Sequence, residues 1–101
     1  MSYRLFLDDE RDPKLPLPYT IARSFEAAVG WCEDAGCPNY ISFDHDLGDG
    51  PTGYDFAKWL VERDLDQPGF IPRSFDYAVH SANVVGRANI EGLLDGYLKS
   101  R

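Results

Sequence analysis

The chain has 101 residues and a formal net charge of −7 at pH 7, a length that suits a single domain over residues 1–101 with one small core. The acidic surplus argues against an extended nucleic-acid surface, because phosphate backbones are bound by lysine and arginine. No run of about 18 apolar residues occurs, so no membrane span is predicted. The N-terminal apolar stretch is too short for a signal peptide, and the expected location is the cytoplasm.

Strands and helices are predicted in alternation along the chain. In order, they are a strand over 3–7, a strand over 19–23, a helix between Ser24 and Gly36, a strand over 40–43, a helix from about Gly53, a strand over 76–79 and a helix over 84–98. Pro13, Pro16 and Pro18 exclude a helix in the first connection. The alternation predicts an α/β fold, a small three-layer sandwich in which helices cover both faces of a mostly parallel four-stranded sheet.

The two cysteines do not predict a zinc site. Cys32 falls on the apolar stripe of a predicted helix, and Cys37 comes just before a strand. His45 and His80 come just after strands, so they are expected at the opposite edge of the sheet from Cys37. Two reduced thiols near the core are therefore expected.

Polar residues follow every predicted strand. They are Asp8, Asp9, Glu10 and Arg11 after the first, Arg23 after the second, Asp44, His45 and Asp46 after the third, and His80, Ser81 and Asn83 after the fourth. Parallel strands bring their carboxyl ends to one edge, where ligands bind in open α/β sheets. These groups are therefore expected to form the functional site.

The carboxylates at this edge predict a divalent metal site. Asp8, Asp9 and Asp44 offer the hard oxygen ligands that Mg²⁺ or Mn²⁺ prefers. Without a cation the three carboxylates would repel one another, and at least one would keep its proton. The alternative is that the acidic stretch after the first strand is a solvated turn.

The remaining candidates are suited to proton transfer and to phosphate binding. His80, and less strongly His45, would act as general base or acid on a phosphodiester, or would merely cap a strand end. Ser81, Arg11 and Arg23 would hold phosphoryl oxygens. Asn83 would orient a substrate or, equally, cap the last helix.

Three segments carry a resemblance to the receiver domain of response regulators, which implies a truncated receiver or flavodoxin-like topology. They are "LFLDDE", "SFDHDLGDGPTGYDFAKWL" and "YAVHSAN". Asp8 and Asp9 match the receiver's acidic pair, Asp44 its phospho-acceptor, Ser81 its hydroxyl residue and Gly53 its helix-opening glycine. A proline-rich connection replaces the first receiver helix, and the lysine of the fifth receiver strand has no counterpart in these residues.

A more specific resemblance is to the receiver-derived family named for cyclic-phosphate processing. Its patterns match residues 5–11 with Pro13, residues 43–48 and residues 80–83. The resemblance implies a metal-dependent phosphoesterase that takes a small cyclic-phosphate substrate, either a 2′,3′-cyclic end or a cyclic nucleotide. In that reaction Asp44 would bind metal or attack phosphorus.

Three alternatives to this interpretation stay open. One is a degenerate receiver that accepts phosphate on Asp44 as a signalling module. Another is a module that binds a cyclic nucleotide or phosphate without hydrolysing it. The third ranks below the other two: the spacing of Asp44 and Asp46 resembles the D-x-D of haloacid-dehalogenase phosphatases, where the second aspartate is the general acid, but that family needs a later lysine and a larger fold.

Overall fold

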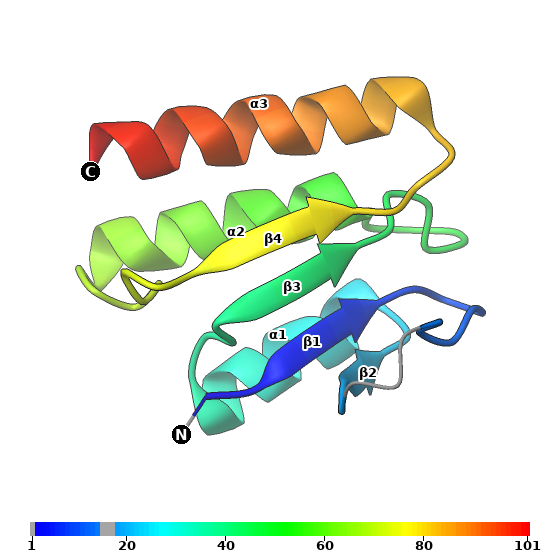
Figure 1. The fold of residues 1–101 in the computed structure, drawn as a ribbon, viewed down its shortest axis with the longest axis horizontal. Helices are drawn as coiled ribbons and strands as arrows, with labels where there is room; N and C mark the ends of the chain where they lie inside the picture. The colour runs from blue at the N-terminus through cyan, green and yellow to red at the C-terminus, as the bar shows by residue number, and fades with distance from the viewer. Residues whose placement is uncertain (1, 15–17) are drawn as a thin grey trace.

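The computed structural model describes residues 2–14 and 18–101. In this part of the chain the elements are β1 (Arg4–Leu7), β2 (Thr20–Ala22), α1 (Phe25–Ala35), β3 (Tyr40–Phe43), α2 (Gly53–Asp66), β4 (Asp76–Val79) and α3 (Val84–Ser100) (Figure 1). The predicted elements are confirmed, and α3 runs on beyond the expected end at residue 98. Within the described residues of the proline-rich connection no helix forms, and Pro16 lies outside them.

Polar caps fix where each helix begins. The side chains of Ser24, Thr52 and Asn83 each accept a hydrogen bond from a backbone N–H in the first turn of α1, α2 and α3. Thr52 and Asp55 satisfy one another's backbone N–H groups in a capping box. The helix starts that matter for the site are therefore encoded locally.

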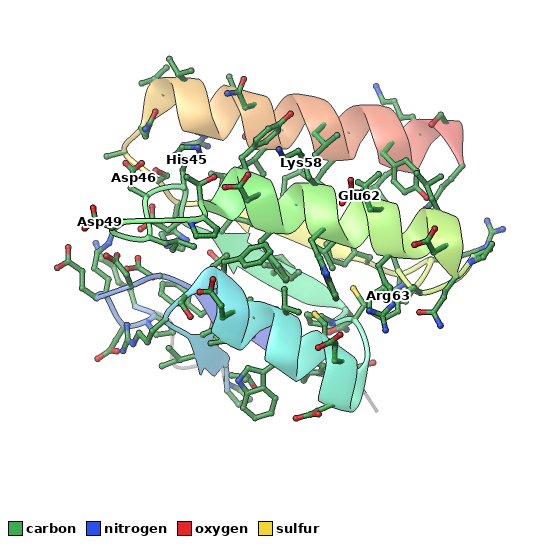
Figure 2. All side chains as sticks on the ribbon, turned by 180° about the vertical axis from the view of Figure 1, so that it is seen from behind. His45, Asp46, Asp49, Lys58, Glu62 and Arg63 are labelled. Carbon is green, nitrogen blue, oxygen red and sulfur yellow. The ribbon has the colours of Figure 1, made fainter. Side chains whose placement is uncertain are left out.

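The described strands form one parallel sheet in the order β2-β1-β3-β4, which confirms the expected α/β class and receiver-like topology. The helices, however, lie in one layer. α2 packs against both α1 and α3, and α1 and α2 lie behind the sheet in Figure 1 and in front of it in Figure 2.

The expected three-layer sandwich is therefore wrong, and the described residues form two layers. The physical reason is the first connection, because the prolines remove the crossover helix that would have covered the second face. The burial pattern agrees. Leu5 of β1 and Ile41 and Phe43 of β3 belong to the core beneath the helices. The alternate residues of the same strands, Phe6 and Ser42, point to the other face and lie outside that core.

Both cysteines are free thiols, as expected. Cys32 is buried in the core, and burial raises the pKa of its thiol to about 12. Across the described residues, no helix combines the length and the hydropathy needed to cross a bilayer.

Asp64, a buried aspartate near the C-terminal end of α2, links α2 to the following connection and to the end of α3. Asp64 accepts hydrogen bonds from Tyr97 Oη at 2.6 Å and from the backbone N–H of Ile71 at 2.8 Å. Burial raises the pKa of the Asp64 carboxyl, but these hydrogen bonds and the charge of Arg101 outweigh it and hold the pKa below its usual range. The ionised form therefore stabilises the fold above the ordinary carboxyl pKa, and this contribution is lost as the pH falls through the lowered value.

We expect Asp64→Asn to lower the free energy of unfolding by about 2–3 kcal/mol at neutral pH, because the amide cannot accept every hydrogen bond offered to it. The difference in the free energy of unfolding between the variant and the wild type should become smaller in acid, because Asp64 is then increasingly protonated. Urea unfolding at pH 7 and at about pH 3 measures both values. Asp66→Asn, at an exposed position of the same helix, is the matched control, and equal losses in the two variants would contradict the role of the buried network.

Candidate active site at the carboxyl ends of the strands

The register of the sheet places Asp8, Asp44 and His80 at one level. The backbone ladder continues one residue past the strands, since the N–H of Asp44 donates to Leu7 O and the N–H of His80 donates to Phe43 O, both at 2.9 Å. Side chains alternate between the faces of a sheet, so these three emerge on the face that the helices do not cover. Neighbouring strands thus bring together residues that lie far apart in the sequence.

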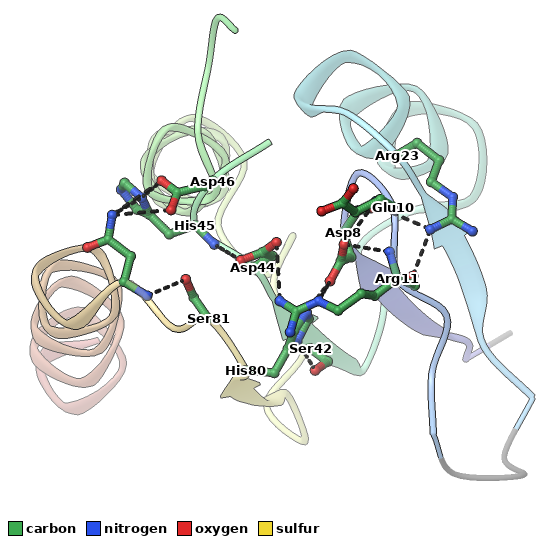
Figure 3. A network of polar contacts seen from close by, with 11 residues as sticks. Asp8, Glu10, Arg11, Arg23, Ser42, Asp44, His45, Asp46, His80 and Ser81 are labelled. Carbon is green, nitrogen blue, oxygen red and sulfur yellow. Dashed lines mark hydrogen bonds and ion pairs between the residues drawn. The ribbon is translucent and has the colours of Figure 1, made fainter. Parts of the chain in front are cut away.

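Asp8, Asp44 and His80 form a compact cluster (Figure 3). Each offers one oxygen or nitrogen donor atom, and these atoms all lie within 4.8 Å of one another. The Asp8 carboxylate is 0% exposed and Asp44 is 5% exposed. Two buried carboxylates beside a partly exposed imidazole are a donor set that suits a divalent cation.

Asp8 is the organising residue of the cluster. Its Oδ1 accepts hydrogen bonds from the backbone N–H groups of Glu10 at 3.0 Å and Arg11 at 2.9 Å. Its Oδ2 accepts from Arg11 Nε at 3.0 Å and faces His80 Nε2 at 3.0 Å. Burial raises the pKa of Asp8, but these donors and the charge of Arg11 more than offset it and lower the pKa overall.

Arg11 supplies the positive charge closest to both carboxylates. Its Nη2 lies 3.6 Å from Asp44 Oδ2, and its side chain is 52% exposed. Asp8, followed by the smaller effect of Asp44, raises the pKa of Arg11. The guanidinium therefore balances the cluster while one part of it faces solvent, where an anion would meet it.

Ser42 belongs to the site, although the sequence analysis did not select it. Its Oγ lies 2.8 Å from His80 Nδ1, and its residue is 8% exposed (Figure 3). A hydroxyl can donate or accept, so Ser42 holds either tautomer of His80. The signal in the sequence was a lone serine at the centre of the apolar strand "YISF".

His45, Asp46 and Asn83 form a second hydrogen-bonded group, and Figure 3 shows His45 and Asp46 beside the cluster. His45 Nδ1 lies 3.0 Å from Asp46 Oδ1, and Asn83 Nδ2 donates to the same oxygen at 3.2 Å. The His45 ring packs so closely on Gly86 that a Cβ there would overlap it. Figure 2 shows His45 and Asp46 where α2 begins. This position favours a packing role for His45.

Ser81 and Asp9 line a cavity of about 380 Å³ together with Asp44, Asp46 and Arg11. Ser81 Oγ accepts a hydrogen bond from the backbone N–H of Asn83 at 3.1 Å. Asp9 does not belong to the cluster of donor atoms found among the described residues. It instead lines this cavity.

Arg23 supports the loop that follows β1. Its Nη1 donates to Arg11 O at 2.7 Å and to Asp8 O at 3.3 Å, and its Nη2 donates to Asp12 Oδ1 at 2.6 Å. These contacts favour a structural role for Arg23. Asn83 likewise caps α3, since its Oδ1 accepts from the N–H of Gly86 at 2.8 Å, as one of the two expectations had it.

The parallel sheet and the acidic pocket at its carboxyl edge, which Asp44 and Ser81 both line, define a receiver-like domain. The chain belongs to the cyclic-phosphate processing receiver domain family, whose model matches residues 3–96. A curated relative, the adenylate-forming reductase Nps11 of Serpula lacrymans var. lacrymans (strain S7.9), is 34% identical over 65 residues. That match covers 62% of this chain and 6% of the reductase. No solved structure is significantly similar to the chain.

Proposed function

We propose that this domain is a metal-dependent phosphoesterase that acts on small cyclic phosphates. The observation that carries the proposal is the cluster of Asp8, Asp44 and His80, in which two buried carboxylates and an imidazole meet. It lies where ligands bind in open parallel sheets. Membership of the cyclic-phosphate processing family supports the same substrate class.

The donor set favours Mn²⁺ over Mg²⁺. Asp8 and Asp44 offer oxygens that suit both ions, whereas the imidazole of His80 is a poorer ligand for Mg²⁺. Among the described residues, Arg11 is the arginine or lysine within hydrogen-bonding reach of the Asp8 carboxylate, and half of its side chain is exposed. When bound, the cation would polarise the phosphoryl group and stabilise the charge that develops on it.

The other residues of the site would bind and orient the substrate. Arg11 turns from Asp44 toward a non-bridging phosphoryl oxygen, and the Ser81 hydroxyl donates to another across the same cavity. Ser42 holds His80 in place through Nδ1. The Nε2 atom of His80 then either binds the cation or moves a proton, and the two roles have different signatures.

Turnover of 2′,3′- and 3′,5′-cyclic phosphates with Mn²⁺ or Mg²⁺ tests the proposal. We expect hydrolysis by the wild type, faster with Mn²⁺, and losses of about 100-fold or more in Asp44→Asn and His80→Ala. A His80→Ala variant with unchanged Mn²⁺ affinity would mark a proton-transfer residue, and one with lost affinity would mark a ligand. Asp34→Asn, at an exposed position of α1, should keep wild-type turnover. Absence of wild-type turnover with every substrate would overturn the proposal.

A phospho-acceptor module is the second candidate. Asp44 lines the solvent-open cavity with Ser81, as an acceptor requires. Incubation with acetyl phosphate should then give a stable aspartyl phosphate that Asp44→Asn cannot form. Binding of a cyclic phosphate with neither hydrolysis nor phosphorylation would instead identify a non-catalytic sensor.

A further inference from the structure

A second cavity, of about 310 Å³, opens on the helix-free face of the sheet next to the acidic cluster. Aromatic rings and site residues line it together, among them Phe6, Tyr19, Tyr40, Ser42, His80 and Arg11. The proposed phosphoesterase mechanism uses only Arg11, Ser42 and His80 among these lining residues. It gives no role to the rings of Phe6, Tyr19 and Tyr40.

The sheet register explains why the rings converge. Phe6 pairs with Ile21 on β2 and with Ser42 on β3. Tyr19 and Tyr40 come two residues before these partners, so they flank Phe6 on the same face. The Phe6 and Tyr19 ring centroids lie 5.7 Å apart in an edge-to-face arrangement. Tyr19 and Tyr40 are half-buried, which leaves ring surface open to the cavity.

The aromatic cavity adjoins the acidic cluster and shares a residue with the 380 Å³ cavity in which the phosphate is proposed to bind. His80 stacks on Phe6 with centroids 4.6 Å apart and planes 5° apart, and its Nε2 faces Asp8. Arg11 lines both cavities. A ligand whose phosphate lies against Arg11 would therefore place its next flat group among the tyrosine rings.

We propose that this cavity binds the base of a cyclic mononucleotide, an inference that rests on the proposed function. Aromatic side chains bind bases by stacking, and the cavity falls at the small end of the volumes that hold small ligands. The polar groups at hand are Ser42 Oγ inside and the charged Asp12 and Lys14 at the lining, which suit hydrogen bonds to the edge of a heterocycle. With a net charge of −7, a single nucleotide fits the molecule better than the end of an RNA strand.

Calorimetric titration tests the base subsite, with and without Mn²⁺. The probes are a nucleoside 3′,5′-cyclic monophosphate, a nucleoside 2′,3′-cyclic monophosphate, a cyclic ribose phosphate without a base, and inorganic phosphate. We expect a base-bearing probe to bind the wild type at least about tenfold more tightly than the base-free cyclic phosphate. Tyr19→Leu should remove most of this advantage and leave the affinity for the base-free probe unchanged.

Two further variants keep the test decisive. Tyr40→Leu should reproduce the loss on the other side of Phe6, and Tyr54→Leu, at a half-buried tyrosine of α2 outside the cavity, should not. Equal affinity of the wild type for base-bearing and base-free probes would overturn the subsite. Hydrolysis of the base-free probe under the same conditions would leave the phosphoesterase proposal intact. Tyrosine-dependent nucleotide binding without any turnover would support the subsite and reject the hydrolase.

Discussion

Asp8→Asn is expected to weaken Mn²⁺ binding by about 100-fold or more, since the substitution removes a buried anionic ligand. Asp8 contributes an oxygen to the cluster, and its Oδ2 also contacts His80 Nε2 and Arg11 Nε. Asp8→Asn should therefore lower the Mn²⁺ affinity more than the substitution of any other single carboxylate near the site. Isothermal titration with Mn²⁺ measures it directly.

Asp9→Asn is the matched comparison. Asp9 stands next to Asp8 in the chain but outside the cluster of donor atoms, so its variant should bind Mn²⁺ within about tenfold of the wild type. A loss in Asp9→Asn as large as that in Asp8→Asn would instead support the ligand set of Asp8, Asp9 and Asp44. An asparagine at position 8 could keep the two backbone hydrogen bonds at Oδ1, but it would set an amide NH2 against Arg11 Nε. Asp44→Asn therefore provides a second ligand variant that disturbs less structure.

Gly53→Ala is expected to have the largest effect on stability, a loss of about 3 kcal/mol or complete failure to fold. A Cβ at this first residue of α2 would overlap the carbonyl oxygen of Asp44. That oxygen belongs to the backbone, so relief requires the loop after β3 to move. Any Gly53→Ala protein that does fold should also bind Mn²⁺ more weakly, because Asp44 moves with the loop.

Glycines of α3 provide the controls. Nothing lies within 4 Å of a Cβ at the exposed Gly92, so Gly92→Ala should raise stability by about 0.5–1 kcal/mol through helix propensity alone. The stability of Gly86→Ala should lie between those of Gly53→Ala and Gly92→Ala, because a Cβ at Gly86 would meet the side chain of His45. Thermal and urea unfolding rank the three variants, and a neutral Gly53→Ala would contradict the close approach.

The order of elements was predictable because each has a local signal. Breakers such as Gly36, which takes a φ of 83° at the end of α1, separate the apolar runs, and Ser24 and Asn83 mark helix starts. The convergence of Asp8, Asp44 and His80 followed from one topological rule, that parallel strands end at one edge.

Other features depended on packing that the sequence does not show. The proline-rich connection excludes a helix, but the consequence appears only when the layers are assembled: within residues 2–14 and 18–101, every helix lies on the same face of the sheet. His45 comes one residue further past its strand than His80 does, so its side chain leaves on the opposite side of the chain from Asp44 and its ring turns toward Gly86 in α3. Ser42 carried no motif, and only its place opposite His80 gives it a role.

Arg23 shows why residue type alone is a weak guide to phosphate binding. It lies at the predicted edge, but its guanidinium donors are taken up by Asp8 O, Arg11 O and Asp12. Arg11, by contrast, contacts both carboxylates of the cluster and lines the cavity beside Asp44. The difference lies in the path of the loop after β1, which no local pattern specifies.

The two faces of the sheet also protect the fold from mispaired strands. In β1, Leu5 and Leu7 point to the helices, whereas Phe6 and the following Asp8 point the other way. A slip of one residue between β1 and β3 would turn a carboxylate into the apolar layer and a leucine out of it. Misregistered chains would thus lose core burial and the ligand site in the same step, so the alternation that builds the site also selects the correct pairing as the sheet forms.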